Sequence, residues 1–125
     1  MPKNPFRDIF KVREFRKSLI IACKGILYLF LYHRNMRLIF LAGILAFLAG
    51  LLLKLKGLEL AVLCITITLV FMAEIFNTAI ELMMNAITEQ YHPKIKIIKD
   101  IAAGVVVLAC LNSIAVGCAL FLRKI

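Results

Sequence analysis

The chain has 125 residues, which is the size of one domain, and 63% of them are hydrophobic. Soluble domains are roughly 45–50% apolar, so a soluble chain this short has no room to bury so much apolar surface, and the composition predicts a membrane protein. The net charge of +9 is interleaved with long apolar spans, which disfavours a nucleic-acid-binding surface and favours anionic membrane lipids as the partner.

Residues 1–35 are predicted to form a cytoplasmic or interfacial helix. No cleavable signal peptide is expected, because this N-terminus is polar and basic and no A-x-A site follows an early apolar core. Apolar side chains then recur at near-helical spacing, at Leu19, Ala22, Cys23, Ile26, Leu27 and Phe30. The pattern is typical of an amphipathic helix lying on the membrane surface, and a soluble core helix is the alternative.

Three transmembrane helices are predicted downstream, at residues 36–54, 58–87 and 98–122. Polar segments separate them, KLKGLE (54–59) and TEQYHPKIK (88–96). Each span reaches or approaches the roughly 20 residues that are needed to cross the hydrocarbon core. The predicted fold class is therefore all-α, with residues 1–125 forming a single integral-membrane domain.

The distribution of Lys and Arg predicts that the N-terminus lies in the cytoplasm and the C-terminus outside. This orientation places twelve of the sixteen basic residues on the cytoplasmic side, and leaves four outside: Lys54, Lys56, Arg123 and Lys124. Basic residues concentrate on the cytoplasmic side of membrane proteins. The segment 88–99 then faces the cytoplasm, where nucleotides are.

Four cysteines lie in apolar surroundings, at Cys23, Cys64, Cys110 and Cys118. They lack the CxxC spacing of a metal or redox site, so they are interpreted as small hydrophobic residues.

The most informative stretch is AEIFNTAIELMMN at residues 73–85, inside the second apolar span. Residues three, four and seven apart share one face of a helix, so Glu74, Asn77, Thr78, Glu81 and Asn85 form one polar stripe. An acid at the centre of a membrane helix costs about 2.5–3.5 kcal/mol. A structural span gains nothing from that cost, so the stripe is interpreted as a chemical site.

The spacing of the two acids indicates two different roles. Seven residues at about 1.5 Å rise put the α-carbons of Glu74 and Glu81 roughly 10 Å apart, too far for a pair that shares one proton. Phosphoryl transfer needs such a division, because one group orients or deprotonates a hydroxyl while another holds the metal on the nucleotide phosphates. The segment after the stripe adds Lys99, a compact positive charge suited to phosphate. The glycines form neither a P-loop nor a dinucleotide-binding fingerprint, so a soluble-fold kinase is not expected.

The sequence resembles the small integral-membrane diacylglycerol kinase and undecaprenol kinase family of bacteria over about residues 14–122. The resemblance is carried by AEIFNTAIE, YHP, KD-x-AAG and RNMR (34–37). It implies a surface helix, three transmembrane helices, a homotrimeric bundle with active sites shared between protomers, ATP as phosphoryl donor and Mg²⁺ as cofactor. The implied location is the bacterial cytoplasmic membrane.

The resemblance also assigns candidate site residues by motif position. Glu74 would be the catalytic base, and Glu81 a metal ligand. The lipid substrate would meet Glu74, Asn77, Ala103 and Arg37, and the nucleotide would meet Glu81, Gln90, Tyr91, His92, Lys99 and Asp100.

Three positions depart from the family pattern. His33 stands where a second acidic metal ligand is usual, and is carried as a candidate ligand beside Glu81. Asn85 replaces a common aspartate. Ala103 replaces the serine of diacylglycerol-type members, which points toward the undecaprenol type, and the sequence leaves both undecaprenol and diacylglycerol open as the lipid. The leading function is therefore an ATP-dependent lipid kinase, and the alternatives are an inactive relative with a regulatory role and a small proton-conducting or transport subunit.

Overall fold

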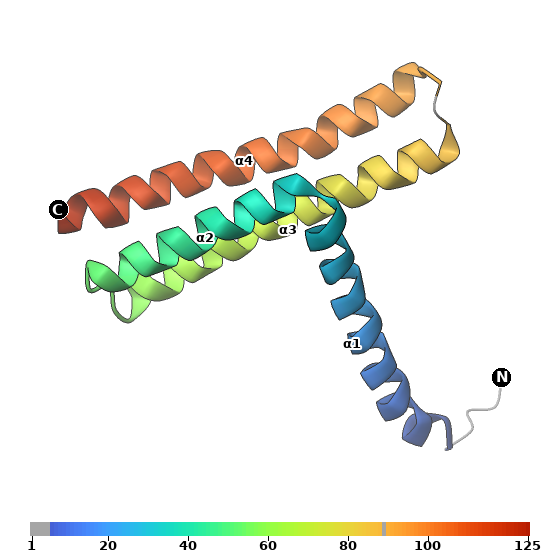
Figure 1. Ribbon diagram of the computed structural model, residues 1–125, viewed down its shortest axis with the longest axis horizontal. Coiled ribbons are helices and arrows are strands. Elements are labelled where there is room, and N and C mark those ends of the chain that lie inside the picture. Colours follow the sequence, from blue (N-terminus) through green and yellow to red (C-terminus); the bar gives the residue numbers. More distant parts are fainter. Residues whose placement is uncertain (1–5, 89) are drawn as a thin grey trace. The chain divides into compact units, whose positions relative to one another are not determined.

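The structure is a computed structural model that describes residues 6–88 and 90–125, with side chains from residue 14 onward. Four helices follow one another: α1 (Phe6–Tyr32), α2 (Arg34–Leu52), α3 (Leu58–Ile87) and α4 (Pro93–Lys124) (Figure 1). The described residues contain no strand, so the predicted all-α class is confirmed. The helices divide into two compact units, Met1–Arg34 and Asn35–Ile125.

The first unit contains α1, which confirms a helix within the predicted range 1–35; residues 1–5 lie outside the described residues. Near its C-terminal end the rings of Tyr28 and Tyr32 lie 4.7 Å apart. The helix ends at Tyr32, and the backbone N–H of the next residue, His33, donates to the carbonyl oxygen of Leu29 at 2.9 Å. The placement of α1 on a membrane surface stays a prediction.

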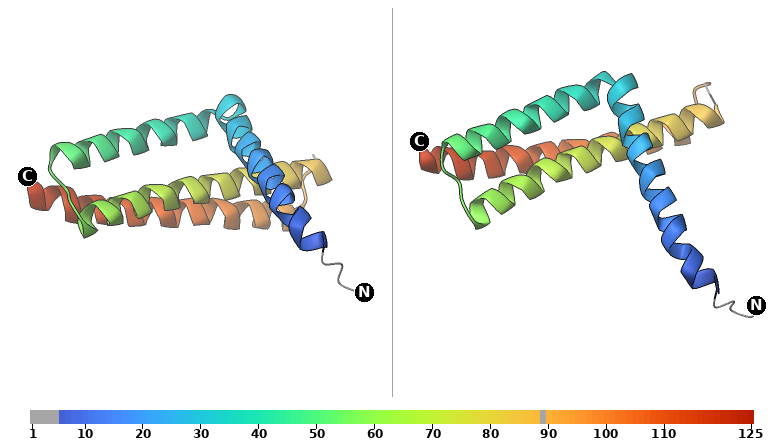
Figure 2. Two further views of the ribbon diagram at one scale, coloured as in Figure 1. Left: turned by 90° about the horizontal axis from the view of Figure 1, so that it is seen from below. Right: turned by 60° about the horizontal axis from the view of Figure 1, so that its bottom comes forward.

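The second unit consists of α2, α3 and α4, and each of these helices is long and apolar enough to cross a membrane. Figures 1 and 2 show α3 and α4 side by side along most of their length, with α2 alongside. On the α2 side, the rings of Phe40 and Phe71 lie 5.7 Å apart. The protein is therefore a membrane protein with three candidate spans.

A tight turn joins α2 to α3. Lys54 and Gly57 both have a positive φ, of 62° and 61°, and glycine reaches that region without steric cost. The turn is closed by a hydrogen bond from the N–H of Leu55 to the carbonyl oxygen of Gly50 at 3.0 Å. Leu55 is only 2% exposed, and a Cβ at Gly50 would lie 2.6 Å from the Leu63 side chain. The side chain of Leu63 thus occupies the space that a side chain at Gly50 would need.

The last helix begins earlier than the sequence prediction. The sequence predicts a polar segment at 88–96 and a span from residue 98. In the structure the helix already starts at Pro93. Proline is favoured in the first helical turn, where a backbone N–H has no intrahelical partner. His92 acts as the N-cap, because its Nδ1 accepts a hydrogen bond from the N–H of Lys94 at 3.2 Å. The helix extends before the predicted span because capping, not apolar content, sets where a helix begins, and the bounds of the membrane-spanning part stay a prediction.

Candidate functional site

The polar stripe lies on one continuous helix, as predicted, and its exposure changes along that helix. Glu74 and Thr78 are buried within the second unit, at 6% and 5% exposed. Glu81 and Asn85, further towards the end of α3, are exposed. The stripe therefore runs from an enclosed acid to an open one.

Asn77 lies between the two acids and carries a buried polar atom. Its side-chain oxygen is enclosed and has no hydrogen-bond partner among the described residues. Buried polar atoms are normally hydrogen-bonded, so such an acceptor points to a ligand or another donor that completes the site. The position of Asn77, one turn from Glu74, suits an oxygen that accepts from a substrate hydroxyl.

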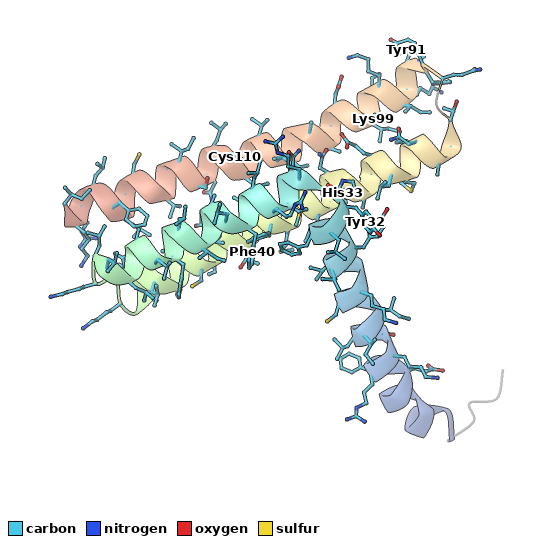
Figure 3. The ribbon with its side chains drawn as sticks, in the orientation of Figure 1. Tyr32, His33, Phe40, Tyr91, Lys99 and Cys110 are labelled. Carbon is cyan, nitrogen blue, oxygen red and sulfur yellow. The ribbon has the colours of Figure 1, made fainter. Side chains whose placement is uncertain are left out.

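A polar cavity of 400 Å³ opens at the junction of α3 and α4. Its lining comes from the end of α3, the connecting loop and the first two turns of α4: Asn85, Thr88, Gln90, Tyr91, His92, Ile95, Lys96 and Lys99. Figure 3 shows Lys99 and Tyr91 at this end of the unit. The cavity combines an aromatic ring, amide groups and two lysines, which is a suitable set for a nucleotide base and its phosphates.

The two lysines of this cavity have different partners. Lys99 Nζ donates to Asn85 Oδ1 at 2.8 Å, across the gap between α4 and α3. Lys96 Nζ lies 2.9 Å from Asp100 Oδ2, one turn along α4. Lys99 is thus oriented by a neutral amide, whereas Lys96 is paired with a carboxylate.

The predicted nucleotide residues are partly brought together. Gln90, Tyr91, His92 and Lys99 line the polar cavity, whereas Glu81 and Asp100 do not. The cavity also includes residues that the prediction left out, namely Thr88, Ile95 and Lys96. The hydroxyl of Thr88 accepts a hydrogen bond from the N–H of Gln90 at 3.0 Å, a contact that only the structure reveals.

The remaining candidates are dispersed. Ala103 and Arg37 are exposed on α4 and α2. His33 belongs to the first unit and Glu81 to the second, so their pairing at a metal stays a prediction. Among the residues that the structure describes, no group of three or more His, Cys, Asp or Glu side chains is placed to hold a metal ion.

An oxygen-only site for Mg²⁺ is nevertheless compatible with the residues on α3. Glu81 presents an exposed carboxylate one turn from Asn85. Magnesium is commonly held by one or two carboxylates together with substrate phosphates and water. A single exposed protein carboxylate is therefore compatible with that ion in the presence of a phosphate ligand, although it does not form a closed protein cage.

Comparison with known proteins identifies the family of this chain. The family described as prokaryotic diacylglycerol kinase matches residues 20–121. A diacylglycerol kinase of Synechocystis is 38% identical over 106 residues, which cover 84% of this chain and 61% of that protein. An undecaprenol kinase of Bacillus subtilis is 32% identical over 115 residues, which cover 92% of this chain and 94% of that protein. The chain belongs to the prokaryotic diacylglycerol kinase family.

Proposed function

We propose that this chain is an ATP-dependent kinase that phosphorylates the hydroxyl group of a membrane lipid alcohol. The observation that carries the proposal is the order of groups along one face of α3. The buried carboxylate of Glu74 is followed, about 16 Å further along the helix, by Asn85, which binds Lys99 at the edge of the polar cavity. A lipid kinase needs a base near the membrane interior and a phosphate site nearer the water.

The reaction assigns one role to each end of this face. Glu74 accepts the proton of the lipid hydroxyl while the hydroxyl oxygen forms a bond to the γ-phosphorus of ATP. The bond between that phosphorus and the β–γ bridging oxygen breaks, and ADP leaves. A buried carboxylate is suited to act as a general base because water is kept from hydrogen-bonding to the oxygen that accepts the proton.

Lys99 is assigned to the nucleotide. Its ammonium group compensates the negative charge of the phosphates, and its hydrogen bond to Asn85 fixes its direction. Glu81 would hold the magnesium ion, which neutralises charge on the phosphate oxygens when it is bound. Tyr91 is exposed at the same cavity, where its ring can stack on the base.

The lipid is proposed to be undecaprenol rather than diacylglycerol. Two points support this choice: Ala103 stands in place of the serine that is usual in diacylglycerol-type sequences, and the Bacillus relative named undecaprenol kinase is matched over 94% of its length. The working unit is proposed to be a homotrimer in the bacterial cytoplasmic membrane, with its N-terminus in the cytoplasm. A trimer would supply groups that enclose the exposed Glu81.

The direct test is phosphorylation by the purified protein in lipid nanodiscs. Labelled ATP and Mg²⁺ are supplied with either undecaprenol or dioleoylglycerol, and the lipid products are separated. The expected result is labelled undecaprenyl phosphate formed faster than labelled phosphatidic acid. If protein that binds nucleotide forms neither product, the kinase proposal is overturned and the inactive relative is favoured.

A further inference from the structure

A second cavity lies on the same face of α3, at the end away from the polar cavity. It has a volume of 340 Å³ and lies between the three helices of the second unit. Leu63, Thr66, Ile67 and Val70 line it from α3. These positions share the helical face that continues into Glu74, because Val70 and Glu74 are four residues apart.

The lining of this cavity suits hydrocarbon. Its walls from α2 and α4 are mostly small or apolar, as at Ala46 and Gly117. The two hydroxyl groups that reach it donate to carbonyl oxygens of their own helices: Thr66 to Val62 at 2.8 Å, and Ser113 to Cys110 at 2.7 Å. Since these donors are already used, the cavity has little to offer water or a polar headgroup.

The position of this cavity relative to Glu74 limits which part of a lipid alcohol could lie in it. Val70 is about 6 Å below Glu74 along the helix axis, on the side away from the polar cavity. A lipid alcohol whose hydroxyl contacts Glu74 and whose phosphate donor occupies the polar cavity must direct its chain the other way. That direction leads past Val70 into the apolar cavity, beside Cys110 on α4 (Figure 3).

We propose that the apolar cavity holds the first prenyl units of the lipid alcohol that is phosphorylated at Glu74. An engineered apolar cavity of about 150 Å³ binds one benzene molecule, so 340 Å³ has room for roughly a dozen carbon atoms. This capacity suits a stretch of one chain, as in a prenyl alcohol, and not two chains that begin together, as in diacylglycerol. The inference rests on the proposed function. It adds that the apolar cavity is the part of the protein that selects the substrate.

Photo-crosslinking tests the occupant without a need for turnover. The wild-type protein in nanodiscs is irradiated with geranylgeraniol that carries a diazirine on its second prenyl unit, and the labelled residues are mapped by mass spectrometry. Labels are expected within 63–70 of α3 and 110–121 of α4, and excess undecaprenol should remove them while dioleoylglycerol should not. Labels only on outward-facing positions, or equal competition by dioleoylglycerol or bulk phospholipid, would overturn the proposal.

Cavity-filling variants provide the kinetic test. A Cβ at Gly117 would meet only Phe121, at 4.0 Å, so Gly117→Leu fills the cavity without a backbone clash, and Ala46→Leu fills it from α2. Both should raise KM for undecaprenol about tenfold or more, which is the effect of losing burial of about two methylene groups. KM for ATP should be unchanged, and KM for prenol should rise much less, because its single prenyl unit would occupy only the part of the cavity nearest Glu74.

The matched control is Ala119→Leu, at an exposed position on α4 outside the cavity, which should behave as the wild type. An equal effect of the cavity-filling variants on prenol and undecaprenol would show a general structural defect and overturn the role in chain binding. The outcomes remain separable from the parent proposal. A wild-type protein that phosphorylates lipid but is labelled elsewhere defeats only this inference, whereas one that phosphorylates no lipid defeats the kinase assignment.

Discussion

Lys99 Nζ on α4 donates a hydrogen bond to Asn85 Oδ1 on α3, with the two atoms 2.8 Å apart. The amide orients the ammonium group without cancelling its charge, because asparagine is neutral. The neighbouring Lys96 has a carboxylate partner in Asp100. Of the two lysines that line the polar cavity, Lys99 therefore offers the larger uncompensated positive charge to a bound phosphate.

Replacing that amide by an acid should weaken nucleotide binding. Asn85→Asp would give Lys99 an ionised partner that competes with phosphate, and charge-assisted hydrogen bonds contribute about 1.5–3 kcal/mol. We expect KM for ATP to rise about tenfold or more, with a smaller change in kcat. Asn85→Gln, which keeps a neutral oxygen acceptor, is the control. An unchanged KM in Asn85→Asp would mean that Lys99 does not contact the phosphates.

Removing the buried carboxylate should abolish most of the turnover. Glu74→Gln keeps the size of the side chain but cannot accept the hydroxyl proton, so kcat should fall about a hundredfold or more, as is typical when a general base is lost. Equilibrium binding of ATP should stay near the wild-type value. Glu59→Gln makes the same chemical change at the other end of α3, where Glu59 pairs with Lys124 at 3.6 Å, and should retain activity. Near-normal turnover in Glu74→Gln would remove this residue from the role of base.

The metal requirement tests whether Glu81 holds the ion and whether His33 is a second ligand. Imidazole is a poor ligand for Mg²⁺ and a better one for softer ions. If Glu81 alone holds the ion, His33→Ala should be tolerated and Mg²⁺ should support the reaction. His33→Glu should then lower the Mg²⁺ concentration needed for half-maximal rate, because a second oxygen ligand is added. An unchanged Mg²⁺ requirement in His33→Glu would show that position 33 does not face the ion. If His33 is itself a ligand, Mn²⁺ should support a faster rate than Mg²⁺ in the wild type, and His33→Ala should abolish that preference.

The predicted topology places Gly57 outside and the 90–96 segment in the cytoplasm. Single cysteines introduced at position 57 and position 94, in a background that lacks the four native cysteines, should react from opposite sides of the membrane with an impermeant thiol reagent. Inverted vesicles provide the reciprocal control. Reaction from the same side at both positions would contradict a membrane-spanning α3.

Sites shared between protomers would be revealed by complementation. Glu74→Gln chains lack the acid and Lys99→Ala chains lack the lysine, and each variant alone should have little activity. A mixed trimer should regain activity if one protomer supplies the acid and another the lysine. Oligomers that contain both chains are verified by pull-down with two tags. Failure of such verified mixed oligomers to recover any activity would argue that each protomer has a self-contained site.

Helical periodicity predicted the polar stripe of α3, and the polar segments that flank the apolar span predicted where the helix begins and ends. The predicted span 58–87 coincides with the helix Leu58–Ile87, because both of its ends are marked by polar segments. The contact between Asn85 and Lys99 was missed, since it depends on the packing of two helices. The apolar cavity had no signal in the sequence, since its lining residues resemble those of any membrane helix.

The length of α3 has a consequence for where the product appears. Its 30 residues extend about 45 Å, whereas the hydrocarbon core of a bilayer is about 30 Å thick. If Leu58 lies at the outer boundary of that core, about 20 residues bring the helix to the inner boundary near Thr78, with Glu74 just inside it and Glu81 and Asn85 beyond it. A phosphate added at Glu74 then emerges among the headgroups of the leaflet that already holds the lipid chain. The proposed reaction then requires neither that ATP enters the bilayer nor that the lipid leaves it.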